Sequence, residues 1–169
     1  MLTHLRIQNF KAWRDTGPVR LAPLTVIFGA NSAGKSSLGH LLLALQQTAR
    51  STDRKRALHL GDSASLIDLG TFADCLYGHE LDRTLSFELG WKLPRALEVK
   101  HPLRPERRYP GTNMRLDVEL VASKTGQPEV QAMAYGLGNE TETVLDVAMR
   151  RDAQRKFTLS SQRYAFKMA

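Results

Sequence analysis

Apolar and polar side chains alternate along residues 2–10, with Leu5 and Ile7 two positions apart, which predicts a β-strand with one solvated face. Residues 19–21 predict a second short strand, because a Gly-Pro turn precedes them and a proline follows them closely. The next segment, residues 24–28, is a continuous run of apolar or β-branched side chains, Leu-Thr-Val-Ile-Phe. A run without alternation predicts a short strand buried on both faces, as in a parallel sheet.

The spacing of the apolar side chains changes after residue 34 to that of a helix. Leucine or alanine recurs at i, i+3, i+4, i+7 and i+11, which places these side chains on one stripe of an α-helix. The stripe consists of Leu38, Leu41, Leu42, Leu45 and Ala49. Residues 50–65 are then mostly polar and predict an exposed loop or an irregular helix end.

A second, shorter helix is predicted for residues 71–77. Thr71 is a residue type that favours the helix N-cap, and Phe72, Cys75 and Leu76 fall on one face. Cys75 is the only cysteine, so it forms no disulfide within the chain. Because it lies among apolar residues, we expect Cys75 to be a small core residue.

After Gly78 the period of the pattern becomes two, which predicts an antiparallel sheet with one solvated face. The predicted strands cover residues 84–89, 114–120, 129–135, 141–149 and 156–159. Glycine and asparagine place turns between them at residues 111–113, 124–128 and 136–139.

Between the apolar run and the long helix, residues 29–36 read Gly-Ala-Asn-Ser-Ala-Gly-Lys-Ser, the G-x-x-x-x-G-K-S pattern of a phosphate-binding P-loop. The first turn of a helix has unpaired N–H groups and a partial positive charge, so it attracts an anion. Gly29 and Gly34 let the backbone curve around a phosphate. Lys35 would contact the β- and γ-phosphate oxygens, and the Ser36 hydroxyl would ligate Mg²⁺.

The nucleotide-binding set also includes the other residues of the loop and the first turn of the helix. They are Ala30, Asn31, Ser32, Ala33 and Ser37. The alternative is a glycine-containing turn that caps an ordinary core helix, but the predicted strand before the motif and the predicted helix after it favour a nucleotide site.

The 169 residues suffice for one domain with a sizeable core. No apolar stretch is long enough to span a membrane, and the N-terminus lacks the apolar core of a signal peptide, so we expect a cytoplasmic protein without membrane contact. The expected organisation is a single lobe, residues 1–169, in three parts. Residues 1–50 hold a strand pair, the P-loop and its helix, residues 51–80 a polar loop and short helix, and residues 81–169 the antiparallel part.

The net charge of +7 is concentrated in two tracts. Residues 91–110 contain six Lys or Arg against two Asp or Glu, and residues 150–169 contain six against one. Basic tracts can bind nucleic acid through its phosphates. They can equally be solvated loops or faces that meet an acidic protein, so charge alone leaves the partner open.

The order of these features resembles the N-terminal half of ABC-type ATPases of the SMC, RecF and OLD kind. The likeness rests on a first strand that ends in Asn9-Phe10-Lys11, a turn, a second strand and the segment 24–37. It is nearest to AAA-family proteins of bacterial anti-phage defence, such as the ATPase parts of Gabija, Septu and retron systems, and residues 68–74 are similar to a segment of that group. It covers roughly residues 1–90. It implies an α/β P-loop NTPase lobe, with a mixed sheet around the P-loop helix and an added antiparallel sheet.

The resemblance implies ATP and Mg²⁺ as cofactors and a homodimer or larger assembly of ATPase heads, in which two heads enclose two ATP molecules. It also implies an effector protein such as a nuclease. The turn after the first strand would lie near the nucleotide, so Trp13 could stack on it and Lys11 or Arg14 could pair with phosphate. Trp13 could equally be a core or edge aromatic residue.

Several parts of an ATPase are missing from the sequence. The acids that follow short apolar runs, Asp68 and Asp146, have too few apolar residues before them and no second acid after them to form a Walker B motif. Residues 159–162, Leu-Ser-Ser-Gln, are similar to the signature motif but lack its glycines. We therefore expect no catalytic residue in this chain. The expected function is an ATP-binding lobe that hydrolyses ATP only when other segments complete it and that gates a defence or DNA-processing effector; the alternatives are a non-hydrolysing nucleotide-binding scaffold and a small P-loop kinase.

Overall fold

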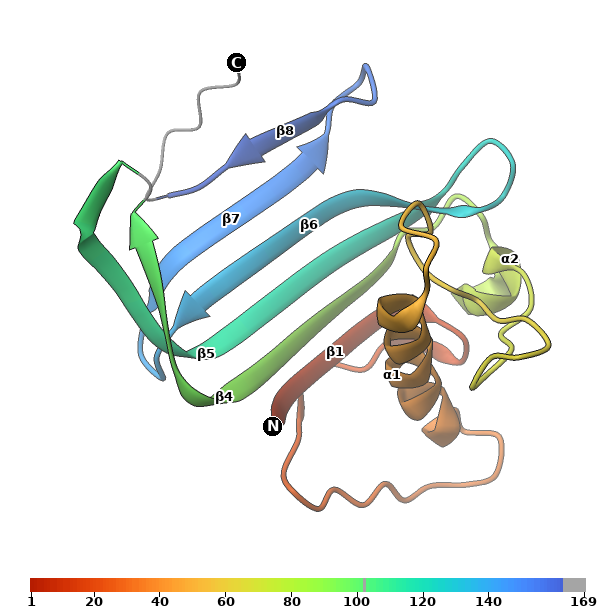
Figure 1. Cartoon of the computed structure of the whole chain (residues 1–169). Coiled ribbons are helices and arrows are strands. Elements are labelled where there is room, and N and C mark those ends of the chain that lie inside the picture. Colours follow the sequence, from red (N-terminus) through yellow and green to blue (C-terminus); the bar gives the residue numbers. More distant parts are fainter. Residues whose placement is uncertain (102, 163–169) are drawn as a thin grey trace.

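The computed structural model describes residues 1–101 and 103–162, and a large antiparallel sheet dominates it (Figure 1). The sheet has eight strands in the order β2-β1-β4-β5-β6-β7-β8, and β3 also pairs with β1. The strands are β1 (Leu2–Phe10), β2 (Trp13–Asp15), β3 (Val19–Arg20), β4 (Leu85–His101), β5 (Arg104–Ala122), β6 (Pro128–Gly138), β7 (Thr143–Arg151) and β8 (Phe157–Ser160).

The helical part is small and lies at one end of the sheet (Figure 1). It comprises α1 (Lys35–Arg50), α2 (Phe72–Cys75) and the 3-10 turn η1 (Tyr77–His79). Among the described residues, no helix has the length and apolar character needed to cross a membrane.

The predicted α/β fold class is wrong. Every pairing between strands of the described chain is antiparallel, from β1 with β2 and β3 through β7 with β8. A P-loop ATPase head alternates parallel strands with helices, whereas this protein is mostly β. The resemblance to ABC-type ATPase heads is therefore contradicted as well. The physical reason is connectivity, because β5 to β8 follow one another through short turns, and short turns join antiparallel neighbours but not parallel ones.

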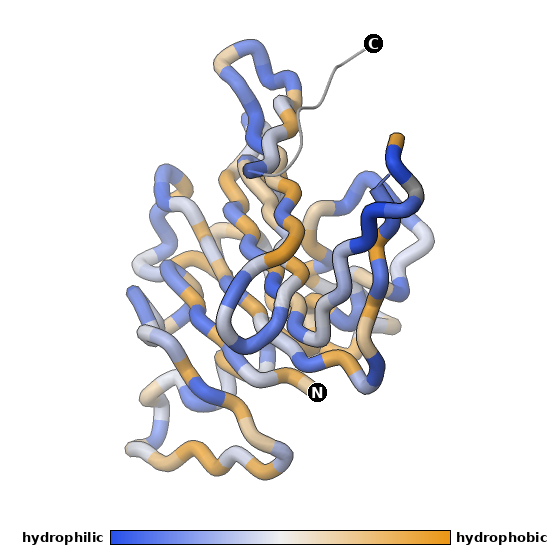
Figure 2. The backbone as a smooth tube through the Cα atoms, turned by 90° about the vertical axis from the view of Figure 1, so that its left-hand side faces the viewer, coloured by the Kyte–Doolittle hydropathy of each residue, from blue (hydrophilic) through white to orange (hydrophobic). Residues whose placement is uncertain are grey.

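The buried strand predicted for residues 24–28 is absent. This segment is an extended loop in which the side chain of Leu24 is 81% exposed and that of Phe28 89% exposed. Figure 2 shows hydrophobic positions along a loop at the lower edge of the molecule. A strand buried on both faces needs a hydrogen-bonding neighbour on each side, and no described strand pairs with residues 24–28. Apolar composition alone therefore does not form a strand here.

The strands predicted from alternation are confirmed, and several are longer than predicted. Strands β4 and β5 extend well beyond residues 84–89 and 114–120 and pair with each other as far as His101 and Arg104. The turn predicted at residues 111–113 is wrong, because these residues lie inside β5. Close packing against β6 requires glycine at position 111, because a Cβ at this position would lie 2.6 Å from Leu137 Cδ1.

The hydrophobic core lies between α1, α2 and the end of the sheet nearest to them. Leu5, Ile7 and Phe10 of β1 are buried, as the alternation predicts. They pack in one cluster with side chains of the two helices and of β4 and β5. These include Leu38, Leu41, Ala44, Phe72, Cys75, Leu76, Leu85, Phe87 and Leu120. Burial raises the pKa of the Cys75 thiol to about 11, as expected for an unreactive core cysteine.

The helical stripe is only partly as predicted. Leu38 and Leu41 are buried, but Ala49 is exposed and Gln47 is buried in its place. The Gln47 amide donates to His59 O at 2.6 Å and to Ile67 O at 3.1 Å, so it holds the 50–65 loop and the following segment against the helix. Although most of this loop is exposed, His59 is buried.

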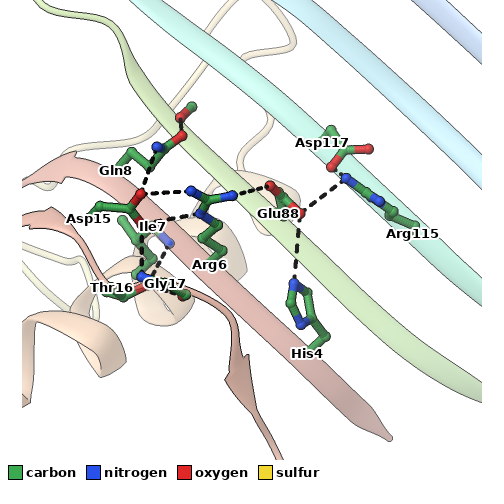
Figure 3. Close-up of polar contacts among 11 residues, drawn as sticks. His4, Arg6, Ile7, Gln8, Asp15, Thr16, Gly17, Glu88, Arg115 and Asp117 are labelled. Carbon is green, nitrogen blue, oxygen red and sulfur yellow. Dashed lines mark hydrogen bonds and ion pairs between the residues drawn. The ribbon is translucent and has the colours of Figure 1, made fainter.

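The opposite face of the sheet is polar, which confirms the predicted solvated face (Figure 3). Arg6 pairs with Asp15 at 2.7 Å, and Glu88 lies within 4 Å of cations on both neighbouring strands, at 3.6 Å from Arg6 and 3.0 Å from Arg115. The Arg6 hydrogen bond holds the pKa of Asp15 well below its usual value. Cross-strand ion pairs of this kind align β1, β4 and β5 without burial.

Candidate nucleotide-binding site

The P-loop motif forms the entry into α1. Gly34 is the N-cap residue, with φ of 82°, and Lys35 begins the helix. The start of α1 has no side-chain cap and no acidic residue in its first turn, although all its residues are described. Ser37 N donates to Gly34 O at 3.0 Å, so the other N–H groups of the first turn and its partial positive charge are left for an external acceptor. The Lys35 ammonium donates to Gly29 O at 2.8 Å and to Ala30 O at 2.6 Å, so it lies across its own loop.

The turn between β1 and β2 supports this loop from behind. The Trp13 indole donates from Nε1 to Gly34 O at 2.9 Å. A Cβ at position 34 would lie 2.7 Å from Ala12 Cβ and 3.1 Å from Trp13 Nε1. Gly34 is thus required twice, for its left-handed backbone and for the close approach of the turn. Trp13 therefore positions the P-loop by a hydrogen bond from its indole to the backbone carbonyl of Gly34.

The segment around α2 forms the facing wall. Lys11 N donates to Cys75 O at 2.7 Å, and the Lys11 ammonium donates to Leu69 O at 3.3 Å. Thr71 caps α2, as predicted, and forms a reciprocal capping box with Asp74. Hydrogen bonds from the Thr71 side chain and backbone lower the pKa of Asp74, so this carboxylate is ionised at neutral pH.

These elements enclose an open cavity of about 610 Å³, a volume typical of small-ligand sites. Of the residues predicted for the nucleotide site, the cavity is lined by Lys11, Ser32, Gly34, Lys35, Ser36 and Ser37. The remaining predicted residues, Gly29, Ala30, Asn31, Ala33, Trp13 and Arg14, lie outside its lining. Lys11 and Lys35 provide its cationic side chains, while Asp74 provides its carboxylate.

Sequence reasoning missed the contribution of residues 74–79 to this cavity. Asp74, Leu76, Gly78 and His79 line it. The capping pattern Thr-x-x-Asp identifies the helix that carries Asp74, but nothing in the pattern indicates that this helix faces the P-loop. The link is tertiary, an isolated bridge between Phe10 and Leu76 that places α2 beside the end of β1.

The acids considered for a Walker B role do not reach the cavity. Asp68 accepts a hydrogen bond from Gly70 N at 2.9 Å within its own turn. Asp146 on β7 accepts from Gln162 N at 3.0 Å, within the stretch similar to the signature motif. Neither acid lines the cavity, so within the described residues Asp74 alone could place a carboxylate near a bound cation.

We expect Gly34→Ala to destabilise the protein more than Gly126→Ala does. Both glycines have left-handed backbones, with φ of 82° and 76°, and this alone costs alanine about 1–2 kcal/mol. Around Gly126 there is open space, whereas at Gly34 the new Cβ meets Ala12, which should add about 1–3 kcal/mol. Urea unfolding of the two variants measures the difference. Equal losses would show that the turn does not press on the P-loop.

Comparison with known proteins does not identify the chain's family. No family model matches it, and a comparison with curated proteins finds no significant match. The functional assignment therefore rests on the P-loop sequence, the helix N-terminus and the cavity between the P-loop and α2.

Proposed function

We propose that this chain binds a nucleoside triphosphate, ATP, with Mg²⁺ in the cavity between the P-loop and α2. The observation that carries the proposal is that a G-x-x-x-x-G-K-S sequence leads into the uncapped N-terminus of a long helix that borders this cavity. Backbone N–H groups and two lysines would bind the phosphates, and the cavity of about 610 Å³ has the volume of a small-ligand site.

The residues present fit a magnesium–phosphate complex. Ser36 lines the cavity with a hydroxyl and Asp74 with an ionised carboxylate, and oxygen is the ligand that Mg²⁺ prefers. Bound Mg²⁺ would neutralise phosphate charge. Lys35 would exchange the Gly29 and Ala30 carbonyls for phosphate oxygens, which requires rotation of a half-buried side chain.

In this proposal the chain binds the nucleotide but does not hydrolyse it at a useful rate by itself. Within the described residues, no second carboxylate lines the cavity to orient an attacking water. Loss of such a group typically costs several powers of ten in rate. This observation favours a nucleotide-binding scaffold, or a lobe that a partner completes.

Thermal unfolding of the full chain with Mg-ATP, Mg-GTP, Mg-ADP and Mg-tripolyphosphate tests the proposal. A ligand that binds only the folded state stabilises it by about 2.7 kcal/mol at one hundred times its Kd, which is a shift of several degrees. We expect Mg-ATP to raise Tm and phosphate release to stay at background in the same samples. No shift with any of these ligands would overturn the proposal. Rapid phosphate release would show that the site is a complete enzyme.

A further inference from the structure

The paired ends of β4 and β5 form an arm that leaves the plane of the sheet. We call residues 93–101 and 103–111 the distal arm. Its pairing breaks between Lys92 and Leu97, where four residues of β4 face a single residue of β5, and then resumes as a two-stranded ribbon from Leu97–Gly111 to His101–Arg104. Figure 1 shows the arm, in green, bent away from the other strands at the end of the sheet opposite α1. A break of this kind bends a strand pair.

The distal arm carries five Lys or Arg against two acids, Glu98 and Glu106, and most of these cations form no ion pair with a described acid. Arg95, Lys100, Arg104 and Arg107 are exposed, and none of them forms an ion pair with a described acid. Of the described lysines and arginines of the arm, only Arg108 forms an ion pair, with Glu98 at 2.7 Å. Arg107 lies over the ring of Tyr109, 5.4 Å from its centroid, which holds one guanidinium in place while leaving its charge available.

The second basic tract, residues 150–169, differs from the distal arm in that its described arginines form ion pairs. Arg150 pairs with Glu119 at 2.9 Å, and both Arg151 and Arg155 pair with Glu129. Of the remaining cations of this tract, Lys156 is exposed and forms no ion pair with a described acid, and Arg163 and Lys167 lie outside the described residues. The structure therefore distinguishes two tracts that composition makes equivalent, because all three described arginines of the second form ion pairs, whereas four of the six cations of the first form none with a described acid.

The shape of the distal arm limits its partner. A two-stranded β-ribbon fits the major groove of B-form DNA, which is about 12 Å wide, whereas the major groove of A-form RNA is too narrow for side chains to read. The ribbon of Leu97–His101 spans five residues, or roughly 17 Å at about 3.3 Å per residue. Its exposed leucines are Leu103 at the tip, 86% exposed, and Leu97, 42% exposed. Two separate leucines are a weak membrane anchor.

We propose that the distal arm binds duplex DNA through its phosphates, with the ribbon lying in the major groove. Arg95, Lys100, Arg104 and Arg107 make the contacts. Such contacts position a protein on DNA without reading its sequence. This interface is separate from the cavity at the P-loop, so it does not depend on the proposed nucleotide site.

Fluorescence anisotropy of the full chain with a labelled duplex of about 20 base pairs, at about 50 to 200 mM salt, tests the proposal. The arm variant replaces Arg95, Lys100, Arg104 and Arg107 with glutamine. The matched control variant makes the same change at four other exposed cations without a described acid partner, and so has the same net charge. These are Arg20, Arg54, Lys55 and Lys124.

We expect the wild-type chain to bind the duplex, with an affinity that falls steeply as salt rises. The arm variant should bind at least about tenfold more weakly, and the slope of log affinity against log salt should fall by about 0.9 per lost phosphate contact. The control variant and Lys35→Ala should bind like the wild type. Thermal melting of every variant confirms that it is folded.

Three results would overturn the proposal. The first is no duplex binding at low salt, and the second is an equal loss in the arm and control variants. The third is tighter binding to single-stranded DNA, duplex RNA or anionic lipid vesicles than to duplex DNA, because the groove argument favours none of them.

Discussion

Lys35→Ala should weaken the binding of Mg-ATP about 10- to 100-fold while leaving Tm nearly unchanged. A hydrogen bond to a charged group contributes about 1.5–3 kcal/mol, and about 1.4 kcal/mol corresponds to a factor of ten in Kd. The folded protein loses little, because the carbonyls of Gly29 and Ala30 that accept from Lys35 are in an exposed loop and can bind water instead. Alanine is also the best helix former at the first position of α1. Isothermal titration calorimetry measures the affinity.

Lys124→Ala is the matched control for this experiment. Lys124 is an exposed lysine in the turn between β5 and β6, so its replacement changes the net charge equally without touching the cavity. We expect it to bind Mg-ATP as the wild type does. Equal affinity of Lys35→Ala and the wild type for Mg-ATP would show that Lys35 does not contribute to the binding site. If both variants bound Mg-ATP equally more weakly than the wild type, the effect would come from the net charge of the protein and not from the position of Lys35.

Phe10→Ala should be the most destabilising of the substitutions considered, with a loss of about 3–5 kcal/mol in the free energy of unfolding. Phe10 is completely buried at the end of β1 and belongs to the core cluster shared by α1, α2 and the sheet. Its backbone forms the bridge to Leu76, so a cavity here should also loosen the wall that faces the P-loop. For a chain of this size we expect Tm to fall by roughly 6–20 °C.

Phe28→Ala is the control, because it removes the same side chain from a position that is 89% exposed. We expect a change within about 0.5 kcal/mol, as for surface substitutions in general. If residues 24–28 formed a strand buried on both faces, the two variants would lose similar stability. Urea unfolding of the pair therefore tests the correction to the fold directly. A loss at Phe28 comparable to that at Phe10 would restore the buried strand.

The local elements follow from local rules. Alternation around Leu5 and Ile7 identifies β1, the period of Leu38 and Leu41 identifies α1, and Thr71 with Asp74 identifies the start of α2. In each case the signal is the match between side-chain period and backbone period, which acts within a few residues. The same rules fail at Gly111, because glycine indicates either a turn or a close contact, and only the neighbouring Leu137 decides between them.

The sequence predicted only one of the two walls of the candidate site, the P-loop. The motif places Gly34, Lys35 and Ser36 together at a helix N-terminus, because the three residues are consecutive in the chain and the helical pattern begins directly after them. The opposite wall, at residues 74–79, is separated from them by about forty positions along the chain. Only the packing of Phe72, Cys75 and Leu76 against the end of β1 brings that wall to the loop.

The sequence by itself thus determined the strands that alternate and the helix that follows the P-loop, and it is the source of the proposal that this loop binds phosphate. The tertiary structure decided the fold class, the exposure of residues 24–28 and the choice between the two basic tracts. The physical reason is the same in all three cases. A strand needs a partner strand for its hydrogen bonds, an apolar side chain needs a surface to cover it, and an arginine is neutralised only by a nearby acid. Each of those partners lies far away in sequence, as Glu119 does from Arg150, and only folding brings them together.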